Sequence, residues 1–215
     1  MDAKLALSGS VDTDSSAEME VPRSDLAHPN RVIVFARFPE PGAAKTRLIP
    51  ALGQDRAARL QVALTHRTLD VVRRHCSLGP CDFEVRYCGG AASDMRERFG
   101  LAHRYSAQTG DGLGERLRLA VSAAFVEGAK RVVVIGTDCP ELEPVILEDA
   151  FKALSRADVV LGPAVDGGYY LIGLRADQPE LFCGIDWSTE RVFEQTVRTL
   201  TSALLEARLH TPHLL

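Results

Sequence analysis

Short apolar runs alternate along this chain with longer segments in which apolar residues recur at helical spacing. The run RVIVFA, residues 31–36, is apolar and β-branched and is followed by a loop rich in proline and glycine, as expected of a strand buried on both faces. Residues 54–75 instead place Leu60, Leu64 and Val71 on one helical face. The pattern predicts strands at 31–36, 81–89, 103–108, 130–136, 157–163 and 167–174, and helices at 54–75, 92–100, 110–129, 144–155 and 188–207, the last with Ser188 or Thr189 as its N-cap.

Strands that alternate with helices indicate a mostly parallel sheet covered by helices on both faces. In such sheets, ligands bind beyond the carboxyl ends of the strands. The loop after Ala36, the turn that holds Asp138 and the loop after Pro163 each follow a predicted strand. We therefore expect these three segments to meet in one cleft.

Residues 1–30 are rich in Ser, Asp and Glu and have little apolar periodicity. They lack the basic start and long apolar core of a signal peptide, so we expect a disordered leader followed by a single domain at 31–215. No apolar run approaches the roughly 20 residues that a membrane helix needs, so no membrane span is expected. The formal net charge of -4 argues against a sequence-independent nucleic-acid binder, which would show a basic excess.

The chain has five cysteines, an odd number, and none of them has C-x-x-C spacing. Together with the absence of a secretory signal, they indicate reduced thiols and a cytoplasmic protein. Buried or surface thiols are favoured over a zinc site built from Cys76, Cys81 and Cys88.

The segment FARFPEPGAAKTRL, residues 35–48, contains a Lys-Thr pair that suggests a P-loop. Aligning that pair puts Pro39 and Ala44 where the two glycines belong, and neither residue can replace glycine there. Cations beside exposed backbone donors would still suit a diphosphate, although ordinary solvated charges are the alternative. The candidate nucleotide or phosphate ligands are Arg37, Gly42, Lys45 and Arg47.

Two further segments carry acidic residues directly after predicted strands. In VVVIGTDCPEL, Asp138 could hold Mg²⁺ or Mn²⁺ while substrate phosphates fill the remaining positions of the ion; a turn-forming Asp is the alternative. In GPAVDGGYYLIGL, Asp166 could orient or deprotonate a hydroxyl, and a tyrosine could pack on a sugar ring. A hairpin with an Asp-Gly turn and core tyrosines is the alternative there. Asp166 is the candidate catalytic residue, and Asp111, Gly167, Gly168 and Tyr169 are candidate sugar or acceptor ligands.

Five motifs in order, FARFPEPGAAKTRL, GDGLGERL, VVVIGTDCPEL, GPAVDGGYYLIGL and IDWSTERVFEQT, resemble the GT-A-like transferase family associated with radical-SAM and selenodomain proteins. Members of that family are described as arsenosugar-biosynthesis glycosyltransferases. The resemblance runs from about residue 31 to residue 196. It implies a Rossmann-like three-layer α/β/α sandwich of the nucleotide-diphospho-sugar transferase type. More distantly, the chain is similar to guanylyltransferases that act on phospholactate or molybdopterin.

The resemblance also implies roles for individual residues. It places Lys45 and Arg47 near nucleotide phosphates, and Asp138 at the acidic metal-binding motif, which here is Thr-Asp-Cys in place of Asp-x-Asp. It places Asp166, Gly167, Gly168 and Tyr169 along the sugar or acceptor side.

The expected function is that of a metal-dependent transferase that uses Mg²⁺ or Mn²⁺, a nucleotide-activated sugar and a small-molecule acceptor. The first alternative is a nucleotidyltransferase that uses an NTP. The second is a non-catalytic nucleotide-binding protein, because relatives commonly continue to an acidic segment whereas this sequence ends at LHTPHLL.

Overall fold

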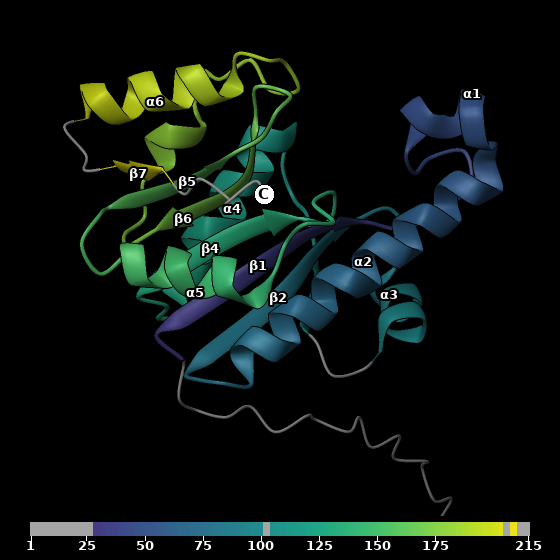
Figure 1. The fold of residues 1–215 in the computed structure, drawn as a ribbon, viewed down its shortest axis with the longest axis horizontal. Helices are drawn as coiled ribbons and strands as arrows, with labels where there is room; N and C mark the ends of the chain where they lie inside the picture. The colour runs from purple at the N-terminus through teal and green to yellow at the C-terminus, as the bar shows by residue number, and fades with distance from the viewer. Residues whose placement is uncertain (1–27, 101–103, 204–206, 210–215) are drawn as a thin grey trace, which may run out of the picture.

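Seven strands form one sheet in the computed structural model, which describes residues 28–100, 104–203 and 207–209 (Figure 1). Most of the predicted leader, residues 1–27, lies outside these ranges, as do 101–103, 204–206 and 210–215 of the predicted domain. The strands are β1 (Asn30–Arg37), β2 (Cys81–Cys88), β3 (Arg104–Ala107), β4 (Arg131–Gly136), β5 (Val159–Pro163), β6 (Tyr169–Leu174) and β7 (Ala207–Leu209).

The strand order is β3-β2-β1-β4-β6-β5-β7. Strand β6 runs antiparallel to both of its neighbours, β4 and β5, and every other pair is parallel. The predicted mostly parallel sheet is therefore confirmed, and the carboxyl ends of β1, β2 and β4 share one edge.

The helices are η1 (Thr46–Leu48), α1 (Ile49–Leu52), α2 (Gln54–Cys76), α3 (Ala92–Phe99), α4 (Leu113–Val126), α5 (Pro144–Ala153), η2 (Pro179–Phe182) and α6 (Val192–Ser202). Figure 1 shows α2 running beyond the strands, with α1 at its far end. Within the described ranges, no helix is both long and apolar enough to cross a membrane.

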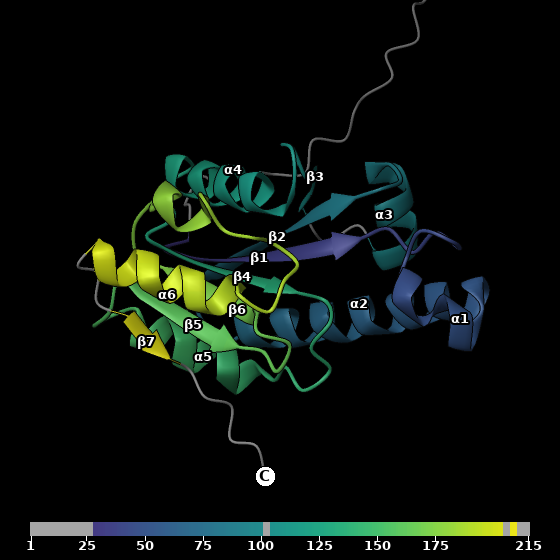
Figure 2. The same cartoon turned by 90° about the horizontal axis from the view of Figure 1, so that it is seen from above.

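Alternating residues of the strands face two separate apolar layers, which makes the sandwich three-layered. Val32 and Val34 of β1 belong to the layer that contains α2, α3 and α5, whereas Ile33 belongs to the layer with α4 and α6. Figure 2 shows α2 and α4 on opposite sides of the sheet. All three residues are fully buried, as expected of strands covered on both faces.

The predicted final helix, 188–207, was wrong at both ends. Helix α6 begins after Arg191, and Ser188 adopts a left-handed conformation, φ 66°, instead of capping it. Thr189 donates its hydroxyl to Asp186 O at 2.7 Å, so its side chain belongs to the preceding turn. Ala207 lies in β7, which pairs with β5, because the edge of the sheet offers backbone partners that helical periodicity does not reveal.

A network of charged side chains joins β1, β2 and β3 at their shared face. Glu84 on β2 is only 1% exposed and accepts hydrogen bonds from Arg86 and Arg104, both at 3.1 Å. Arg104 also donates to Glu127 at 2.7 Å, and the buried Arg31 pairs with the same Glu127. Since a buried charge is tolerated only with partners, this network fixes how the three strands meet.

We expect Glu84→Gln to lower the free energy of unfolding by about 3–5 kcal/mol, because it leaves the charge of Arg86, at a poorly solvated site, without its carboxylate partner. Urea denaturation measures this loss. The matched control is Glu194→Gln, which removes an exposed pair with Arg198 and should change the free energy by less than about 0.5 kcal/mol. Equal, small losses in both variants would show that the buried network does not stabilise the sheet.

Candidate functional site

A large cleft opens at the carboxyl ends of β1 and β4, the two adjacent parallel strands in the middle of the sheet. Their register pairs Phe35 with Gly136, the last residue of β4, and β1 continues only to Arg37, so the loops that follow both begin at the same end of the sheet. The cleft has a volume of about 1220 Å³ and extends to the β5–β6 turn and to the segment before α6. It exceeds the roughly 300–1,000 Å³ typical of a small-ligand pocket, and so has room for a nucleotide and a second substrate.

The loop after β1 brings an ammonium group to an acidic turn. Lys45 has φ 50°, an uncommon left-handed conformation for a residue other than glycine. Its side chain is 15% exposed, and Nζ lies 2.5 Å from Asp138 Oδ1. The backbone N–H groups of Ala43 and Ala44 both donate to Glu40 O, at 3.1 and 3.0 Å, and are therefore not free to cradle phosphate as in a P-loop.

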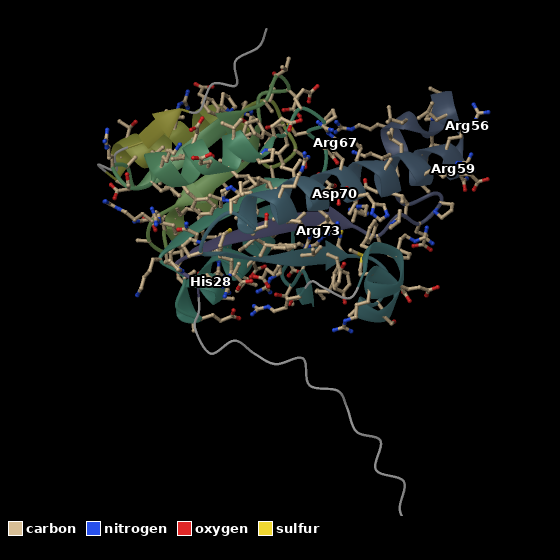
Figure 3. The ribbon with its side chains drawn as sticks, turned by 60° about the horizontal axis from the view of Figure 1, so that its bottom comes forward. His28, Arg56, Arg59, Arg67, Asp70 and Arg73 are labelled. Carbon is tan, nitrogen blue, oxygen red and sulfur yellow. The ribbon has the colours of Figure 1, made fainter. Side chains whose placement is uncertain are left out.

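Helix α2 holds the turn that carries Asp138. Thr137 is buried and accepts a hydrogen bond at 3.0 Å from Gln61 Nε2. Arg67, labelled on α2 in Figure 3, donates from Nε to Pro140 O at 2.5 Å. The residues on both sides of Asp138 are thus fixed, while its own side chain remains 72% exposed to the cleft.

The turn between β5 and β6 packs closely against the segment before α6. Asp166 Oδ1 accepts a hydrogen bond from Gly168 N at 3.0 Å, which closes an Asx turn. Gly167 has φ 84°, and a Cβ at this position would lie 2.1 Å from Glu190 O. Phe193 N also donates to Gly167 O at 2.9 Å. Gly167 therefore joins two walls of the cleft and does not itself line it.

Two adjacent tyrosines line the cleft from opposite faces of β6. Tyr169 packs edge-on against Trp187, with ring centroids 6.2 Å apart, and burial raises the pKa of its hydroxyl. Among the described residues, the buried hydroxyl of Tyr170 has no hydrogen-bond partner. Burial, and secondarily the Cys139 thiol, raise the pKa of Tyr170 to about 12. A buried hydroxyl without a partner at the wall of a cleft is a candidate ligand contact.

The structure brings together most of the residues predicted from sequence, but not all. Gly42 is an exposed turn residue of the first loop, outside the cleft lining. The backbone N–H of Asp111 donates to Glu115 Oε2 at 2.7 Å, so this residue belongs to the turn that begins α4. Of the predicted residues, seven line the cleft: Arg37, Lys45, Arg47, Asp138, Asp166, Gly168 and Tyr169. Gly42, Asp111 and Gly167 are not part of its lining.

For several lining residues, little in the sequence indicated that they would reach the cleft. Gln61 lies within an amphipathic helix, where a polar residue usually faces solvent. Arg116 follows the GDG turn, and only the orientation of α4 directs it to the cleft. Trp187 lines the cleft and also packs against Gly114.

The acidic residues of the cleft fit a divalent ion shared with substrate. Within the described ranges, no three His, Cys, Asp or Glu side chains cluster as an all-protein metal site would require. Asp138 and Asp166 nevertheless both line the cleft. Mg²⁺ is commonly held by one or two carboxylates together with substrate phosphates and water, so this donor set suits such an ion and not an all-protein site.

Residues 68–189 match the family model described as "Uncharacterized protein conserved in bacteria (DUF2064)". No protein with a curated description matches the chain.

Solved structures share the fold. A protein from Desulfovibrio desulfuricans G20, provisionally described as a nucleotide-diphospho-sugar transferase, is 35% identical, with a TM-score of 0.80 over 85% of this chain and 80% of that one. Rv0371c of Mycobacterium tuberculosis H37Rv, solved in complex with manganese, is 17% identical, with a TM-score of 0.52 over 85% and 86%. A nucleotidyl transferase from Methanothermobacter thermautotroptrophicus is 17% identical, with a TM-score of 0.57 over 84% and 86%.

We expect Gly167→Ala to lower the free energy of unfolding strongly. The new Cβ would meet the Glu190 backbone at 2.1 Å, and the alanine would also have to adopt a positive φ. Gly184→Ala is the matched control: this glycine also has a positive φ, 67°, but nothing lies within 4 Å of its Cβ position. The control should lose about 1 kcal/mol and Gly167→Ala clearly more, as measured by denaturant unfolding. Similar losses would show that the two walls are not in close contact.

Proposed function

The chain belongs to the family described as "Uncharacterized protein conserved in bacteria (DUF2064)", and we propose that it is a metal-dependent transferase that uses a nucleotide-activated sugar. The observation that carries this proposal is the meeting of Lys45 and Asp138, 2.5 Å apart, at the carboxyl ends of two parallel strands. Cations opposite carboxylates at such a site suit a nucleoside diphosphate leaving group. The 35% identity to the Desulfovibrio protein supports the same class of substrate.

The cations of the first loop would bind the diphosphate. The side chain of Lys45 is mostly buried, and its ammonium lies beside Asp138, where it would meet a phosphate oxygen of the bound diphosphate. Arg47 and Arg37 also line the cleft and would add charge-assisted hydrogen bonds. Together these groups would stabilise the negative charge that develops on the leaving diphosphate.

Asp138 would hold the divalent ion, with Asp166 as a second carboxylate on the same cleft. Bound there, Mg²⁺ or Mn²⁺ would supply charge neutralisation of the diphosphate. Asp166 lies in a turn fixed by its own hydrogen bond to Gly168 N, and would orient or deprotonate an acceptor hydroxyl. Tyr169 and Trp187 would provide the aromatic surface on which a sugar ring packs.

Calorimetry tests the class of substrate directly. We expect a UDP- or GDP-sugar to bind with measurable heat in Mn²⁺ and at least tenfold more weakly in EDTA, because the diphosphate then lacks the ion. A chain that binds no sugar nucleotide in the presence of Mn²⁺ would contradict the proposal.

Nucleotidyl transfer is the second candidate, since the fold shared with the Methanothermobacter nucleotidyl transferase suits it equally. In that reaction, the same cations would neutralise a pyrophosphate leaving group. The products distinguish the two: free nucleoside diphosphate from a sugar nucleotide favours glycosyl transfer, and pyrophosphate from an NTP favours nucleotidyl transfer.

We expect Asp138→Asn to lower turnover at least about 100-fold and to abolish the difference in sugar-nucleotide affinity between Mn²⁺ and EDTA, because an amide is a poor ligand for a divalent ion. The matched control is Glu141→Gln, which removes an acidic side chain from the same segment but outside the cleft lining, and should retain both properties. Nucleotide binding that responds neither to metal nor to Asp138→Asn would instead favour a non-catalytic binding protein.

A further inference from the structure

Two cysteines at the end of the sheet opposite the cleft lie unusually close together. Cys76 is the last residue of α2, and Cys81 is the first residue of β2. Their Sγ atoms are 2.6 Å apart. Non-bonded heavy atoms settle roughly 3.5–4.0 Å apart, whereas two sulfurs in a disulfide are about 2.0 Å apart. The two thiols therefore lie closer than ordinary packing brings them.

The backbone keeps the two cysteines together without a covalent bond between the sulfurs. Ser77 N donates to Arg73 O at 2.9 Å, which closes the end of the helix, and Cys81 N donates to Gly79 O at 2.8 Å, which begins the strand. Only four residues separate the two cysteines. Because the helix end and the strand start are both fixed, the cost of bringing the sulfurs together has been met by the fold.

We propose that Cys76 and Cys81 are a dithiol site that closes to an intramolecular disulfide on reaction with a small-molecule disulfide such as oxidised glutathione. Cys76 is half-buried, whereas Cys81 is 9% exposed, so the reagent reaches Cys76 first. The contact with Cys76 and burial both raise the pKa of the Cys81 thiol, which keeps its proton until Cys76 has reacted.

The reaction balances in two exchange steps. Cys76 Sγ, as thiolate, attacks one sulfur of the oxidised glutathione and expels the first glutathione thiolate, leaving a mixed disulfide. Cys81 then gives its proton to solvent, and its Sγ attacks Cys76 Sγ and expels the second glutathione thiolate. The two cysteines are oxidised by two electrons, and one glutathione disulfide is reduced to two thiols.

The remaining cysteine of this strand cannot take part. Cys88 ends β2 and lines the cleft, seven residues along the strand from Cys81, or roughly 23 Å at the rise of a β-strand. A zinc site made of Cys76, Cys81 and Cys88 is excluded by the same distance. The dithiol thus lies apart from the cleft, and its chemistry is independent of the proposed transferase function.

Peptide mapping of the native protein tests the proposal. After treatment with oxidised glutathione, alkylation of the remaining thiols and digestion with trypsin, one peptide, residues 75–86 (HCSLGPCDFEVR), contains both cysteines. We expect this peptide to be lighter than its reduced form by two hydrogen atoms and to carry neither alkyl group nor glutathione. The peptide 176–191, which contains Cys183, is the internal control and should carry glutathione or the alkyl group, because Cys183 is exposed and forms no disulfide among the described residues.

Thermal unfolding gives a second, independent readout. The closed disulfide should raise the melting temperature by roughly 5 °C, and dithiothreitol should reverse the rise. Cys76→Ser should abolish the dependence on oxidised glutathione, whereas Cys183→Ser should retain it. A peptide 75–86 that keeps two alkylated thiols, or that stops at a glutathione adduct, would overturn the proposal whatever the cleft binds.

Discussion

The parallel pairing of β1 with β4 is the constraint on which the cleft depends. These strands are distant in sequence, yet their register places Phe35 opposite Gly136, the last residue of β4. The residues that follow, in a cation-bearing loop on one side and an acidic turn on the other, must then leave the sheet at the same edge. The contact of Lys45 with Asp138 follows from this adjacency.

Helix α2 converts that adjacency into a fixed geometry. Gln61 holds the Thr137 hydroxyl in the core, and Arg67 holds the Pro140 carbonyl at the surface, so the turn is restrained on both sides of Asp138. The two residues other than glycine that have positive φ within the described ranges, Lys45 and Ser188, both line the cleft. Backbone strain of this kind persists only where the surrounding structure imposes it, and it is concentrated at functional sites.

The antiparallel strand β6 gives the cleft two different walls. Its first two residues, Tyr169 and Tyr170, point to opposite faces of the sheet, one toward Trp187 and the other toward Cys139. The cleft therefore straddles the sheet edge and does not lie over one face. The cleft offers a ligand both charged side chains, such as Lys45 and Asp138, and aromatic rings, as the proposed sugar nucleotide would need.

The sequence by itself determined the alternation of strands and helices, because buried β-branched runs and helical periodicity are local properties of the chain. It also predicted that Lys45, Arg47, Asp138 and Asp166 would lie in one cleft, since each follows a strand whose end could be predicted. Only the tertiary structure decided which neighbours these residues meet, that Gly167 acts through close packing against Glu190, and that Gln61 and Tyr170 reach the cleft. The β5–β7 pairing and the approach of Cys76 to Cys81 were likewise beyond local pattern, because both depend on how separate elements are placed against each other in space.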